Sequence, residues 1–112
     1  MTTLKNNVQL IGRLGNDPEL RTFESGKKMT TFSMATNETY YNNKGEKVED
    51  TQWHNIVAWG KKAEIASDYL KKGSEVALQG KLVNRKYEHE GVTKYVTEIN
   101  LADLLLMDKK EQ

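Results

Sequence analysis

Both tryptophans of the chain lie in one short segment, residues 51–60. Alternation along a strand would put Trp53 and Trp59 on one face and Ile56 and Ala58 on the other. The small apolar side chains suit a core, whereas large exposed rings on an open sheet usually mark a binding surface. Unpaired nucleobases bind to flat rings with positive charge nearby, so this face predicts a platform for single-stranded nucleic acid.

Length and composition limit the class of protein. A chain of 112 residues is long enough for one domain with a single modest core. It has no cysteine, which excludes disulfides and thiolate metal sites and is typical of a reducing cytoplasm. The 17 basic and 16 acidic residues give a formal net charge of +1, so phosphate binding must depend on local segregation of charge.

The sequence shows no sign of export or membrane insertion. Its first residues lack the apolar core of a secretory signal, and no apolar run approaches the length of a membrane span. We therefore expect a soluble, cytoplasmic protein without membrane contact.

The first half of the chain predicts strands. Residues 7–14 alternate apolar and polar side chains and stop at the turn sequence of residues 15–18. Residues 19–23 can continue extended, and residues 28–36 predict a second strand before the tryptophan strand. The polar residues 40–47 contain Asn-Asn and Gly, which predicts a mobile projecting loop.

The second half predicts one helix and two more strands. Residues 61–72 place apolar side chains at helical spacing and end in lysines before a glycine, which indicates a short helix. Residues 75–82 alternate again, and their polar face continues as far as Tyr87. After a hairpin turn at residues 89–91, a long final strand is expected over residues 92–106.

This order of elements predicts an all-β OB-fold. The expected architecture is a five-stranded Greek-key barrel with one short helix between strands 3 and 4, which binds oligonucleotides on one face and in its loops. Gly12, Gly60 and Gly80 are expected bend points of the sheet. The barrel domain is expected to occupy residues 1–107, followed by a short polar tail at residues 108–112.

Five blocks of the chain share one order with a known family. They are IGRLGNDPELR (11–21), FSMATNET (32–39), TQWHNIVAWGK (51–61), ASDYLKKG (66–73) and GKLVNRKY (80–87). In these blocks the chain resembles the bacterial single-stranded DNA-binding protein family, from about Asn6 to Met107. The resemblance implies an OB-fold subunit, usually a homotetramer, that binds and protects single-stranded DNA at the nucleoid during replication, recombination and repair.

The resemblance also assigns stacking roles to four rings, which are Trp53, Trp59, Tyr40 and Tyr87. A ring stacked on a base contributes roughly 1 to 3 kcal/mol by truncation. An alternative for Tyr40, and the preferred interpretation for Tyr41, is that the ring simply packs a loop.

Basic side chains are the candidates for phosphate contact. Lys61, Lys72, Arg85 and Lys86 match family positions near the DNA path, and Lys81 shares the alternating face of Arg85. The competing interpretation for Lys81, Arg85 and Lys86 is a solvated face of a sheet. Alternation sends Lys86 to the face opposite Arg85, so it can reach the ligand only through a bulge or a loop position.

No residue pattern predicts catalysis. His54 lies on the apolar side of its strand, where a hydrogen-bonded structural histidine is expected, and the resemblance places it near subunit contacts. His89 has no second histidine or cysteine spaced to share a metal, so neither a metal site nor a cofactor is predicted. A nuclease would need clustered metal ligands, but Glu49 and Asp50 are the only adjacent acidic residues. We therefore expect no catalytic residues and no enzymatic activity.

Other interpretations stay open. The chain could be a protein-interaction or replication-restart OB-fold subunit with weak nucleic-acid binding, although four rings at stacking positions count against it. RNA competes with DNA as the ligand because nothing visible in the sequence excludes a 2′-hydroxyl. Family members typically continue into an acidic tip that recruits repair and replication enzymes. Since this chain ends at Gln112 without such a tip, that recruitment is not expected, whether the chain is a paralogue, a phage form or a shortened protein.

Overall fold

A computed structural model describes residues 5–107, so the predicted tail at residues 108–112 lies outside the described residues. The described part contains strands and one helix. In chain order they are β1 (Val8–Leu14), β2 (Glu19–Thr22), β3 (Lys28–Tyr41), β4 (Lys47–Trp59), α1 (Lys61–Tyr69), β5 (Glu75–His89) and β6 (Val92–Leu106).

Five of these strands close into a barrel because β1 has a partner on each side. Along most of its length β1 pairs with β5, and its last residues, Arg13 and Leu14, pair with β3. The order β1-β5-β6-β4-β3 therefore returns to β1. This arrangement confirms the predicted OB-fold, with α1 between β4 and β5, which are the third and fourth strands of the barrel. The short β2 pairs with β3 outside the closed barrel.

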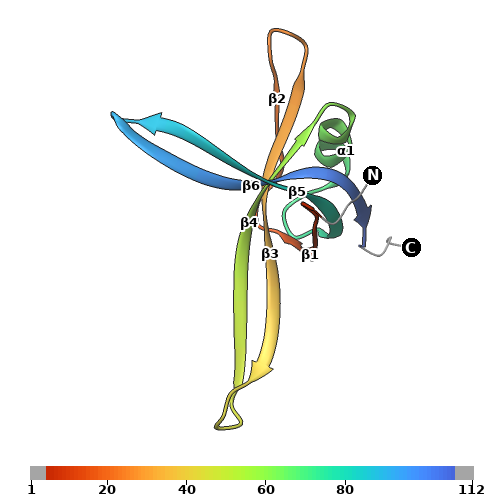
Figure 1. The fold of residues 1–112 in the computed structure, drawn as a ribbon. Coiled ribbons are helices and arrows are strands. Elements are labelled where there is room, and N and C mark those ends of the chain that lie inside the picture. Colours follow the sequence, from red (N-terminus) through yellow and green to blue (C-terminus); the bar gives the residue numbers. More distant parts are fainter. Residues whose placement is uncertain (1–4, 108–112) are drawn as a thin grey trace, which may run out of the picture.

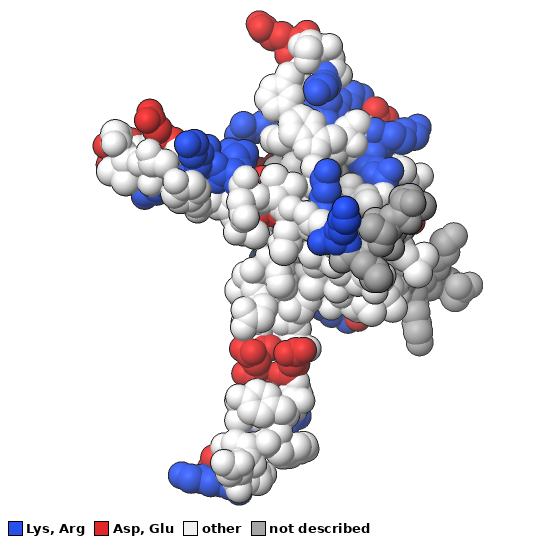
Figure 2. All heavy atoms as spheres, in the orientation of Figure 1, with Lys and Arg blue, Asp and Glu red and all other residues white. Residues whose placement is uncertain are grey.

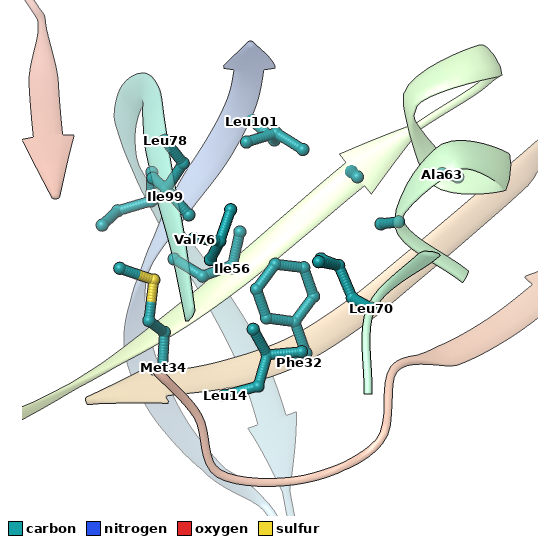
Figure 3. Close-up of a cluster of buried hydrophobic side chains, with 12 residues drawn as sticks. Leu14, Phe32, Met34, Ile56, Ala63, Leu70, Val76, Leu78, Ile99 and Leu101 are labelled. Carbon is teal, nitrogen blue, oxygen red and sulfur yellow. The ribbon is translucent and has the colours of Figure 1, made fainter. Parts of the chain in front are cut away.

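The core lies inside the barrel and is built by alternation along each strand (Figure 3). Phe32 and Met34 of β3 point inward, as do Ile56 and Ala58 of β4. The buried cluster consists of Leu14, Phe32, Met34, Ile56, Ala58, Ala63, Ala66, Leu70, Val76, Leu78, Ile99 and Leu101. The predicted inner face of the tryptophan strand is therefore correct, and its large rings lie on the outer face.

Helix α1 packs against the barrel through its smallest side chains. Ala63 and Ala66 are fully buried, and the hydroxyl of the buried Thr30 donates a 2.7 Å hydrogen bond to the carbonyl oxygen of Ala63. The chain enters the helix at Gly60, whose φ of 63° favours glycine. Among residues 5–107, no helix has both the length and the apolar composition needed to cross a bilayer.

Two predicted bend points are sites of close strand approach. A Cβ atom at Gly12 would collide with the carbonyl oxygen of Ala35, and one at Gly80 would collide with that of Asn100. The β5–β6 register also shifts at Gly80. Both positions therefore require a residue without a side chain.

Long hairpins project from the barrel (Figure 1). The structure corrects the loop predicted at residues 40–47, because β3 continues to Tyr41 and β4 already begins at Lys47. Only residues 42–46 form the turn, in which the Asn42 carboxamide oxygen accepts hydrogen bonds from two backbone amides. We call the projecting part, residues 37–51, the β3–β4 arm. The projecting loop is thus present but shorter than predicted. No residue of the arm is buried, so its strand ends show no apolar alternation from which their length could be predicted.

Candidate nucleic-acid interface

A groove crosses the outer face of the barrel. One part has a volume of about 440 Å³, and an adjoining part of about 350 Å³ shares Thr31, Val57 and Glu98 with it. Together they form what we call the groove, which is lined by Asn16, Arg21, Phe23, Met29, Thr31, Phe32, Ser33, Asn55, Ile56, Val57, Trp59, Val83, Arg85, Glu98 and Asn100. This surface is accessible to a ligand and has aromatic, neutral polar and charged side chains.

Trp53 lies beside the Asn16 end of the groove. Trp53 is 63% exposed, and its ring rests over Gly15, where a Cβ atom would collide with the ring. Across the strand pair Trp53 faces the small Ala35, which also leaves room for the ring. From the sequence, Gly15 was recognised only as a turn residue. Its role under the Trp53 ring was missed, because that role depends on the two residues meeting in the fold.

Trp59 lines the groove and contacts a second aromatic ring. The Phe23 ring stacks on Trp59 with centroids 6.1 Å apart and planes inclined by 25°. The Lys27 ammonium lies 5.8 Å from the centroid of Trp59. Sequence reasoning missed both neighbours, which lie in the turn between β2 and β3. The signal available was a lone phenylalanine within a polar turn.

Arg85 lines the groove but is already paired with a carboxylate. Its Nη2 donates to Glu98 at 2.7 Å and its Nε donates to the other Glu98 oxygen at 3.3 Å. These hydrogen bonds, followed by the charge of Glu98, raise the pKa of Arg85, so the guanidinium stays protonated. The sequence predicted Arg85 as a phosphate contact and did not identify Glu98 or Arg21, which also lines the groove.

The β5–β6 register divides the other candidates of β5 between two faces. Tyr87 shares the face of Arg85, and Lys81 lies opposite the groove residue Asn100. Lys86 lies on the other face, opposite Tyr95, as alternation predicted. Tyr95 is 74% exposed and was not singled out from the sequence.

Tyr40 lies away from the groove on the β3–β4 arm. Between Trp53 and Tyr40 the arm carries three carboxylates, because Glu38 pairs with Asp50 and Glu49 is its neighbour. Figure 2 shows an acidic band across this arm, whereas Lys and Arg gather mainly over the opposite part of the molecule. By alternation Tyr40 shares the strand face of Glu38 and Asp50, whereas Trp53 lies on the opposite face with Glu49. A strand that ran from Trp53 to Tyr40 would have to change faces and pass these like charges.

The remaining candidates lie outside the groove. Lys61 is the first residue of α1, and Lys72 is exposed in the turn after it, where its backbone amide donates to Asp17. His54 is half-buried, and its Nε2 lies 3.1 Å from the Thr36 hydroxyl, which suits the structural role predicted for it. Within residues 5–107, no three His, Cys, Asp or Glu side chains are grouped so that they could hold a metal ion.

This fold and groove can be compared with known proteins. Residues 5–107 match the model of the Single-strand binding protein family. The chain belongs to this family. The match covers all described residues, including both tryptophans, the groove and Glu98.

Curated members of the single-strand binding protein family are similar over nearly the whole chain. The Single-stranded DNA-binding protein 1 of Chlorobaculum tepidum is 45% identical over 108 residues, covering 95% of this chain and 67% of the relative. The Single-stranded DNA-binding protein of Neisseria meningitidis is 42% identical over 108 residues, covering 96% and 62%. The chain thus spans about two thirds of the length of these relatives or slightly less.

Solved structures of single-strand binding proteins share the fold. The Plasmodium falciparum SSB in complex with ssDNA superimposes with a TM-score of 0.84 at 35% identity, covering 96% of this chain and 99% of that one. A deletion mutant of the single-stranded DNA binding protein from Thermus aquaticus gives 0.81 at 25% identity, covering 92% and 50%.

Proposed function

We propose that this chain binds single-stranded DNA without sequence preference and protects it during replication, recombination and repair. The observation that carries the proposal is the position of two exposed rings, Trp59 in the lining of the groove and Trp53 over Gly15, next to the lining residue Asn16. Bases of any sequence present a flat face to such rings, whereas a duplex keeps its bases stacked inside. The 35% identity to a protein solved with ssDNA supports the same ligand class.

Rings and cations have separate roles in this proposal. Trp53, Trp59 and Tyr87 stack on bases, with Tyr40 as an outlying position. Arg85 contacts the phosphates from within the groove, and the exposed Lys61, Lys72 and Lys81 guide the strand outside it. Lys86 lies on the face opposite Arg85, so it contributes only where the strand passes over that face. Stacking sets the affinity, while each phosphate contact adds to its salt dependence. No step requires a metal ion, a cofactor or a covalent reaction.

The proposal is tested by fluorescence anisotropy with labelled oligo(dT), a duplex of equal length and oligo(U), at low and high salt. We expect tight binding of oligo(dT) at both salt concentrations and much weaker binding of the duplex. If oligo(U) binds as tightly as oligo(dT), the proposed ligand is single-stranded nucleic acid in general and not DNA alone. Negligible binding of all three would favour the protein-interaction subunit.

We also propose that the chain assembles into a homotetramer. Within residues 5–107, β1 has a barrel partner on its β3 side only at Arg13 and Leu14, so its earlier part presents an open edge there. A hollow of about 700 Å³, which shares no lining residue with the groove, lies beside this edge and includes the exposed Ile11 and Leu105. Open edges and apolar surface favour pairing of two copies across a twofold axis, which gives a dimer. The proposed homotetramer requires a further contact between two such dimers. Light scattering on the wild type and on Ile11→Lys tests this, because the proposal predicts a tetramer that the lysine disrupts.

A further inference from the structure

Glu98 puts a negative charge on a surface that is proposed to bind a polyanion. Its carboxylate lines both parts of the groove, and its side chain is only 16% exposed. A negative charge here repels phosphates at a site where solvent screens it poorly. On charge alone, a neutral side chain of the same size would repel phosphates less, so the carboxylate requires a separate explanation.

The partner of Glu98 is the cation on which phosphate binding depends. Val83 lies directly opposite Glu98, so Arg85 is its diagonal neighbour on the same face of the β5–β6 pair. Two of the guanidinium donors point at the two carboxylate oxygens, which is the geometry that a phosphate would otherwise occupy. Glu98 is the sole ion-pair partner that the described residues offer Arg85, whose side chain is 56% exposed.

We propose that Glu98 masks Arg85 by occupying its phosphate-binding fork, so that single-stranded DNA must displace the carboxylate to engage this cation. The inference rests on the proposed function and adds a control on affinity to it. The masked pair is neutral, so the groove attracts polyanions less than a free arginine would. Stacking on Trp53 and Trp59 then contributes a larger share of the affinity, which favours unpaired bases over the charged backbone that a duplex also offers.

Salt dependence separates masking from simple positioning. For single strands, each phosphate neutralised changes the slope of log K against log salt concentration by about 0.7. Glu98→Gln keeps the size of the side chain and frees Arg85. In the wild type the displaced carboxylate takes up a cation, which cancels the counterion that Arg85 releases from the phosphate, so the slope of Glu98→Gln should be steeper by about 0.7. Arg85→Gln leaves a bare carboxylate in the groove, so binding should weaken and the slope should become shallower. The double variant restores neutrality, and its slope should return close to that of the wild type.

The test is an oligo(dT) titration of these four proteins at several salt concentrations, with a duplex run in parallel. Asp68→Asn is the matched control, because it removes one exposed carboxylate on α1 outside the groove. At low salt we expect Glu98→Gln to bind oligo(dT) at least about threefold more tightly than the wild type, and to gain even more for duplex. Asp68→Asn should show a smaller change for both ligands.

Each other outcome overturns the inference. Weaker binding by Glu98→Gln than by the wild type would make Glu98 a positioning residue that aims Arg85. Equal gains for Glu98→Gln and Asp68→Asn would reduce the effect to net charge. Thermal unfolding of each variant checks that it is folded. A further variant, Glu98→Ala, should also tighten binding and provides a second test if Glu98→Gln does not fold. If the folded wild type binds no oligo(dT), the proposed function itself fails, whereas a wild type that binds with an unimproved Glu98→Gln refutes only the masking.

Discussion

The ring of Trp53 lies over the backbone of Gly15, with the position of a Gly15 Cβ atom only 2.9 Å from the ring atom Cη2. The Gly15 amide donates a 2.9 Å hydrogen bond to the carbonyl oxygen of Ser33, which fixes this backbone against β3. A residue of the turn after β1 thus determines how a ring of β4 is presented. The orientation of the Trp53 face depends on the absence of a side chain at Gly15.

Gly15→Ala should therefore weaken binding of oligo(dT) with little effect on folding. The new methyl group displaces the Trp53 ring, which is exposed and can swing into solvent at small cost. We expect a loss of up to about 1 to 3 kcal/mol, the usual contribution of one stacked base. The same substitution in a Trp53→Ala background should have almost no further effect on affinity. An equal loss in both backgrounds would show that Gly15 acts through something other than the ring.

Phe23→Ala should weaken binding through Trp59. The two rings stack at 6.1 Å, and an aromatic pair of this kind contributes about 0.5 to 1.5 kcal/mol beyond the area it buries. Without Phe23 the Trp59 ring gains freedom that it must lose again on stacking with a base. Titration of Phe23→Ala, Trp59→Ala and the double variant measures the coupling. Strictly additive losses would mean that Phe23 binds the strand independently of Trp59.

Tyr87→Ala should cost more affinity than Tyr40→Ala. Tyr87 shares the strand face of Arg85, whereas Tyr40 lies beyond the three carboxylates of the β3–β4 arm. We expect a loss of about 1 to 3 kcal/mol for Tyr87→Ala and a clearly smaller one for Tyr40→Ala, because like charges oppose the approach of phosphates to the arm. Titration of both variants with oligonucleotides of increasing length measures the two losses and shows which is larger. The reverse order would place the strand along the arm.

Thr30→Val should lower stability without changing affinity. The buried Thr30 hydroxyl joins β3 to α1 through its hydrogen bond to Ala63, and valine keeps the shape while removing the donor. A loss of about 1 kcal/mol in the free energy of unfolding is expected. Urea unfolding measures it, with Thr93→Val at an exposed position of β6 as the control. A loss no larger than that of the control would show that this hydrogen bond does not secure α1.

Sequence reasoning predicted the barrel because each barrel strand buries one face. Ile56 and Ala58 are buried while Trp53 and Trp59 are exposed, so the period of two appears directly in the residue types. The same reasoning could not predict the length of the β3–β4 arm, whose faces are both exposed. Where no face is buried, strand residues and loop residues are equally polar.

The groove was predicted only in part, for a different reason. Phe23 reaches Trp59 through the pairing of β2, β3 and β4, and Glu98 meets Arg85 only in the observed β5–β6 register. Such contacts depend on how distant segments align, which no local pattern contains. Trp53 and Trp59 could be identified because large exposed rings on a strand are informative without knowledge of their neighbours.

Intrinsic tryptophan fluorescence during titration with oligo(dT) tests the central claim most directly, because Trp53 and Trp59 are the sole tryptophans of the chain. We predict strong quenching by oligo(dT), little quenching by an equal-length duplex, and a reduced change in both Trp53→Phe and Trp59→Phe. The quenching should persist at high salt, since stacking is less sensitive to salt than phosphate contact. Unchanged fluorescence with oligo(dT), under conditions where anisotropy detects binding, would contradict stacking on these rings and place the DNA elsewhere.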